Sequence, residues 1–169
     1  VEATKKLETD VAQYRAALQI CNPAPSRALQ GRVTLRLLRR DADGSWQSAT
    51  PDAGGQLIFR VGEKLDIEVA NHSGISVYPT VVDFGLTGAV GALYPRDGGV
   101  EEWTPGRVQR LYGAAGGIEV RMDDFPFVRM KPGQTVRRTE VVKLFVTAAP
   151  TDFSPLFHEG TMAVMPPSK

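Results

Sequence analysis

The sequence predicts an all-β fold, an immunoglobulin-like antiparallel β-sandwich with one N-terminal amphipathic helix. From Gly31 onward, about seven or eight short segments of alternating hydrophobicity follow one another, and no helical pattern separates them. The chain has 169 residues, of which 42% are hydrophobic and 23% are charged. This length and composition suit one folded core and exclude general disorder.

The helix is expected over residues 5–20, where apolar side chains recur at helical spacings from Leu7 to Cys21. This stripe predicts that the Cys21 thiol is an inert core group. Two prolines in residues 22–25 then end the helix, because proline removes an amide donor and restricts the residue before it. We therefore expect a helix and proline-rich linker over 1–30 and a β-sandwich domain over 31–165.

Two segments in the first half of the domain alternate most clearly. One begins at Gly31 and carries Val33 and Leu37 on the same face. The other, residues 64–71, predicts a half-buried strand with its leucine, isoleucine and valine inward and with Asp66 and Glu68 facing solvent. A loop is expected over 41–55, where turn-forming residues are dense, and a short strand over 56–61.

The second half contains a predicted β-hairpin. Residues 78–84 are apolar on both faces, which favours a central strand, and Gly85 to Gly88 turns the chain into a returning strand over 90–94. Further strands are expected at about 108–113, at 118–122 and at 139–147.

Charge and composition limit the partners. Lys and Arg number 20 against 19 Asp and Glu, so a net charge of +1 favours neither nucleic acid nor an anionic membrane. No stretch approaches the ~20 apolar residues of a membrane span. Cys21 is the only cysteine, which favours a reducing, cytoplasmic compartment. The first residue is Val1, which suggests a fragment or a processed product.

The sequence predicts no catalytic residue, no metal site and no cofactor. His72, His158 and the adjacent Glu159 are too few to supply the ligands of a zinc site. Ser73 beside His72 imitates a Ser-His pair, but no nucleophile elbow accompanies it. The doublets Asp123-Asp124 and Glu101-Glu102 lack calcium-loop spacing, and the glycine-rich run 113–117 lacks the residues of a phosphate loop.

Aromatic side chains in predicted loops are the candidates for binding. The favoured interpretation is that they roof one end of the core, because large apolar side chains usually find burial. The alternative is a docking face, since clustered exposed aromatics are typical of recognition surfaces. The candidate binding residues are Trp103, Arg110, Tyr112, Phe125 and Phe127.

A succession of segments resembles a known domain. The segments are YRAALQICNPAP, GRVTLRLLR, KLDIEVANHSGISVYPTVVDFGLTGAVGALYP and VVKLFVTAAPTDFSPL. Together they look like the β-rich region that follows the peptidase domain in bacterial and fungal caspase-family proteins, and the resemblance covers about residues 10–157. The family's catalytic His-Gly and nucleophilic Cys do not occur among the matching segments.

The resemblance implies a non-catalytic accessory or interaction domain, which regulates a caspase-like cysteine peptidase or recruits a partner or substrate. Its implied partner is a protein, the peptidase domain itself. A different class of function is a stand-alone module that binds carbohydrate or peptide through Trp103 and Tyr112. A third is a small hydrolase that uses Ser73 and His72.

Overall fold

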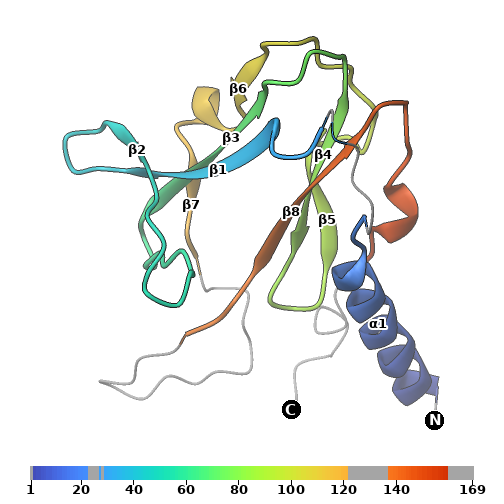
Figure 1. The fold of residues 1–169 in the computed structure, drawn as a ribbon. Helices are drawn as coiled ribbons and strands as arrows, with labels where there is room; N and C mark the ends of the chain where they lie inside the picture. Colours follow the sequence, from blue (N-terminus) through green and yellow to red (C-terminus); the bar gives the residue numbers. More distant parts are fainter. Residues whose placement is uncertain (1, 23–26, 28, 122–136, 160–169) are drawn as a thin grey trace, which may run out of the picture. The chain divides into compact units, whose positions relative to one another are not determined.

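The computed structural model describes residues 2–22, 27, 29–121 and 137–159 of the chain (Figure 1). Two compact units make up these residues. The first contains the described parts of Val1–Pro25, Tyr78–Glu102 and Phe125–Lys169. The second contains the described parts of Ser26–Val77 and Trp103–Asp124.

The second unit is built on a five-stranded antiparallel sheet in the order β2-β1-β3-β6, with β7 also pairing with β3. Pairing places Leu35 opposite Val69 and Leu37 opposite Ile67, so that the alternating apolar residues of two strands share a face. Its elements are β1 (Val33–Arg40), β2 (Trp46–Ser48), β3 (Lys64–Asn71), β6 (Val108–Arg110), the short 3-10 helix η1 (Gly113–Ala115) and β7 (Ile118–Glu119).

The first unit has a three-stranded antiparallel sheet in the order β5-β4-β8, together with the helix α1. Its core is formed by Ala17 of the helix and by Val82, Phe84 and Val90 of the sheet, all at most 2% exposed. The elements are α1 (Glu2–Gln19), β4 (Tyr78–Phe84), β5 (Val90–Tyr94), β8 (Val141–Thr147) and the 3-10 helix η2 (Ser154–Leu156).

Two contacts attach α1 to this sheet. The Tyr14 ring meets the Phe84 ring edge to face at 5.9 Å between centroids, and the Tyr14 hydroxyl donates to the Phe84 carbonyl at 3.4 Å. Lys143 Nζ on β8 donates to the Leu18 carbonyl, and to that of Ile20 at 3.3 Å. A cation at a helix C-terminus satisfies carbonyls that lack intrahelical partners. In Figure 1, α1 (blue) lies next to the orange segment that contains η2.

Over the described residues, the structure confirms a mainly β chain with two antiparallel sheets and one N-terminal α-helix, consistent with a β-sandwich. The immunoglobulin-like type stays a prediction, as does the division at residue 30. The central position predicted for the strand 78–84 is confirmed, because β4 lies between β5 and β8. The returning strand of the hairpin is confirmed as β5.

Three expectations were wrong. Residues 56–61 form no strand. Cys21 is exposed, since α1 ends at Gln19 and the thiol lies beyond the helical stripe. Asp66 faces the interior and is 0% exposed.

Candidate functional site

Trp103, the largest predicted binding residue, is 0% exposed. It pairs with Val77 in an isolated antiparallel bridge, in which each amide donates to the other's carbonyl at 2.8 and 3.0 Å. The Arg107 guanidinium carbon lies 4.5 Å from the centroid of the Trp103 ring. The ring therefore offers no exposed face on which a sugar or a partner could stack.

Arg110 and Tyr112 meet at the buried carboxylate of Asp66. Asp66 Oδ2 accepts from Arg110 Nε at 2.8 Å and lies 2.7 Å from Arg110 Nη2, while Oδ1 accepts from the Tyr112 amide at 3.0 Å. The guanidinium also lies over the Trp46 ring at 4.5 Å. Because a buried charge must be paired, these contacts explain how Asp66 is tolerated inside the unit, and they give Arg110 a structural partner.

The other two candidate binding residues, Phe125 and Phe127, lie outside the described residues, as does the doublet Asp123-Asp124. The predicted aromatic docking face is therefore described only at Trp103, Arg110 and Tyr112. In the described ranges, no group of three or more His, Cys, Asp or Glu side chains is placed to hold a metal ion.

Ser73, the nucleophile of the hydrolase alternative, forms hydrogen bonds with the Asn71 side chain. Its hydroxyl lies 2.5 Å from Asn71 Oδ1 and 3.0 Å from the Ile75 carbonyl, and Ser73 is 3% exposed. Asn71 Nδ2 in turn lies 3.1–3.2 Å from the carbonyls of Ile75, Trp103 and Thr104. This network holds the loops at the end of β3 together, while the neighbouring His72 side chain is exposed.

The first unit has an open sheet edge at β5, which the pattern of the sequence had not led us to expect. Val90 and His158 form an isolated antiparallel bridge, each amide donating to the other's carbonyl at 3.0 Å. On the side of β5 that faces away from β4, the main-chain groups of Val90 are therefore hydrogen-bonded to His158. Both polar main-chain groups of a strand residue point to the same side, and the side alternates along the strand. The β4–β5 register is regular from the Phe84–Val90 pair to the Val82–Ala92 pair and shifts only between Val82 and Val81, so the alternation reaches Ala92 and directs its amide and carbonyl outward.

The pairing with β5 stops beyond Val90 because the segment that precedes His158 forms a 3-10 helix instead of a strand. An antiparallel continuation would place Leu156 opposite Ala92, but Ser154–Leu156 forms η2, which contains Pro155. The Asp152 carboxylate stabilises this turn by accepting from the Ser154 amide at 2.8 Å and the Ser154 hydroxyl at 2.9 Å. Proline and an Asx turn are typical signals that end strand pairing, and they were the available sequence signal for this site.

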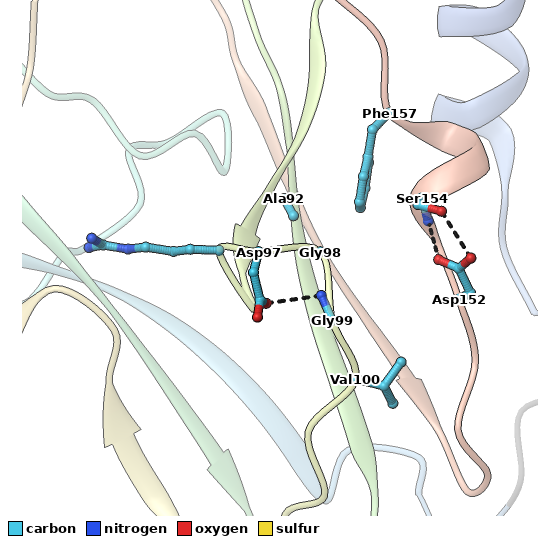
Figure 2. A pocket seen from close by; sticks show the side chains of 9 residues that line it. Ala92, Asp97, Gly98, Gly99, Val100, Asp152, Ser154 and Phe157 are labelled. Carbon is cyan, nitrogen blue, oxygen red and sulfur yellow. Dashed lines mark hydrogen bonds between the residues drawn. The ribbon is translucent and has the colours of Figure 1, made fainter.

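A hollow of about 560 Å³ lies where the segment diverges. Figure 2 shows the Phe157 ring on the side of the hollow opposite Ala92, with the Asp97–Gly99 and Asp152–Ser154 hydrogen bonds at its margin. Its volume is in the range of ligand pockets. The lining residues are Ala92, Arg96, Asp97, Gly98, Gly99, Val100, Asp152, Ser154 and Phe157.

A second hollow, of about 490 Å³, shares Ala92 and Phe157 with the first. The residues that line it include Asp83 of β4, His158 and Glu159. Burial raises the pKa of the Asp83 carboxyl to about 6, and the negative charge of Glu140 adds to the rise. An acid with a raised pKa in a hollow is a candidate binding group. We call the Ala92 edge and the two hollows together the β5-edge site.

Comparison of the chain with protein-family models, with curated proteins and with solved structures gave no match in any of the three. Within the described residues, no helix combines the length and the apolar character needed to cross a membrane.

Proposed function

We propose that the chain is a non-catalytic interaction domain of a caspase-like cysteine peptidase, which regulates that peptidase or recruits its partner or substrate. The observation that carries the proposal is the β5-edge site. An open strand edge offers main-chain hydrogen bonds to an extended segment, and adjoining hollows receive alternate side chains. Both features meet at Ala92, which belongs to the edge and lines both hollows.

The resemblance to the post-peptidase domain supports the same site. Its longest segment contains β4, β5 and the Leu-Tyr-Pro sequence that ends β5 at Tyr94. Its last segment contains β8 and the Thr-Asp-Phe-Ser-Pro-Leu sequence over 151–156, which ends the pairing and opens the edge. The sequence features that point to the peptidase are therefore the ones from which the site is built.

The proposed compartment is the cytoplasm. Cys21 is a free and exposed thiol, and such a thiol persists in a reducing environment. The proposed partner is a protein, and the proposal includes no cofactor and no nucleic acid.

The test begins with the open reading frame around this sequence, which should encode a peptidase domain with a catalytic His and Cys. Binding of that purified domain to the chain is then measured by isothermal titration calorimetry. Ala92→Trp places a large ring at the residue that lines both hollows and should weaken binding at least about tenfold, as expected for an interface centre. Gln47→Trp places the same ring on an exposed position of β2 and should leave binding unchanged. A peptidase domain that does not bind the unaltered chain contradicts the proposal.

A further inference from the structure

The β5-edge site is lined by more negative than positive side chains. Asp97 and Asp152 lie in the first hollow, Asp83 and Glu159 in the second, and Arg96 is the one guanidinium among the lining residues. Within the described part of the chain, none of the four carboxylates forms an ion pair with a cation. The hollows therefore present uncompensated negative charge to an occupant.

Hydrogen bonds to neutral groups hold two of these carboxylates in place. Asp97 Oδ1 accepts from the Gly99 amide at 3.0 Å, and Asp152 accepts from the amide and hydroxyl of Ser154 (Figure 2). These hydrogen bonds orient the carboxylate oxygens, but they do not neutralise the negative charge because the donors are uncharged. A carboxylate that is already positioned loses less side-chain entropy when it pairs with an incoming cation.

Asp83 is accessible across a glycine. In the β4–β5 ladder Asp83 is opposite Gly91, and a Cβ added at Gly91 would meet nothing within 4 Å. The space beside Gly91 is therefore open, and the Asp83 carboxylate borders the same hollow. A long cationic side chain from a segment bound beside Ala92 has a path across Gly91 to Asp83.

We infer that the β5-edge site binds an extended peptide segment bearing lysine or arginine side chains, which adds to the sheet as an antiparallel strand at Ala92. The inference rests on the proposed function and names the chemistry of the partner. The segment continues the pairing with β5 that His158 begins at Val90 and that η2 ends. Main-chain bonds at Ala92 supply the register, and the four carboxylates select basic side chains over acidic ones.

The experiment measures fluorescence anisotropy of labelled synthetic peptides of about seven residues, a usual strand length. In one peptide, lysines alternate with threonine and valine, and in its matched control glutamates replace the lysines. We expect the lysine peptide to bind at least about tenfold more tightly, and we expect its affinity to fall with added salt because three of the four carboxylates are exposed.

Ala92→Pro tests the strand edge, because it removes the outward amide donor and leaves the bonds to β4 intact. Proline is tolerated on edge strands where the amide faces away from the ladder. We expect about a tenfold loss of lysine-peptide affinity, whereas Ala92→Ser, which keeps the amide, should bind normally. A second variant, Asp97→Asn with Asp152→Asn and Glu159→Gln, removes three charges at exposed positions, and each amide keeps one of the two acceptor oxygens of the carboxylate it replaces. It should lower affinity about fivefold.

Circular dichroism of each variant verifies folding. If Ala92→Pro does not fold, the loss of lysine-peptide affinity in the charge variant is the test of the site. Equal binding of the lysine and glutamate peptides, or no binding of either, overturns the basic partner. Unchanged lysine-peptide affinity in a folded Ala92→Pro protein overturns the claim that the peptide pairs with the main chain at Ala92. If the peptidase domain binds the chain while the peptides behave in one of these ways, the proposed function stands and this inference fails.

Discussion

Replacing Asp83 by Asn should stabilise the protein at neutral pH and have almost no effect in acid. The pKa of Asp83 is raised from 3.8 to about 6, chiefly by burial and further by the charge of Glu140. The folded state thus binds the Asp83 proton more tightly than the unfolded chain does. Stability from this group is fully present below the unfolded pKa of 3.8 and is lost as the pH rises through about 6.

The pKa shift of Asp83 sets the expected change in the free energy of unfolding. About two pKa units correspond to at most about 3 kcal/mol, at 1.36 kcal/mol per unit. Because the Asp83 side chain is only half-buried, water screens part of this cost, and we expect Asp83→Asn to raise the free energy of unfolding by about 1–2 kcal/mol at neutral pH.

Urea unfolding of both proteins from about pH 4 to about pH 7.5 measures this difference across the window in which Asp83 titrates. Asp43→Asn is a control of opposite sign. Hydrogen bonds from Ser45 lower the pKa of Asp43, so that carboxylate stabilises the fold above its unfolded pKa and loses the effect in acid. A difference for Asp83→Asn that does not change with pH, or a destabilised variant at pH 7.5, would refute the reasoning.

Further predictions concern the second unit and are all measured by denaturant unfolding. Asp66→Asn removes the charge that balances Arg110 and should cost about 2–3 kcal/mol, less than for a fully buried pair because the Arg110 side chain is 32% exposed; an unchanged midpoint would contradict that role. Asn71→Asp replaces the donor that faces three carbonyls with an acceptor and should cost about 3 kcal/mol, whereas a loss below about 1 kcal/mol would show that the network is unimportant. Gly117→Ala should cost more than about 2 kcal/mol, since the residue has φ of +91° and an added Cβ would lie 2.4 Å from Trp46 Cη2; equal stability would show that Trp46 moves freely.

Local patterns predicted the elements whose pairing is itself local or strongly alternating. The strand over 64–71 has the predicted bounds as β3, because apolar residues alternate throughout it and a turn precedes it. The β4–β5 hairpin follows from its glycine-bearing turn, in which the Gly85 amide donates to the Ala89 carbonyl at 2.9 Å. In both cases neighbouring residues carry the information.

The remaining features depend on residues far apart in the sequence. Asp66 occupies a position that alternation assigns to solvent, and it is buried because Arg110 and the Tyr112 amide reach it from another part of the chain. The Trp103 bridge to Val77 has no local pattern at all. The open edge at Ala92 exists only because a segment from the C-terminal part pairs at His158 and then curls, which no periodicity within β5 can show.

Amide hydrogen exchange at Ala92 tests the central claim most directly. The account predicts fast exchange of this amide in the free chain and a slowing of at least about tenfold when the lysine peptide or the peptidase domain binds. The Gly91 amide, which points toward β4 in the same ladder, should be protected in both states and serves as the internal reference. An Ala92 amide that is already protected in the free chain, or that exchanges at the same rate with the partner bound, would contradict the account.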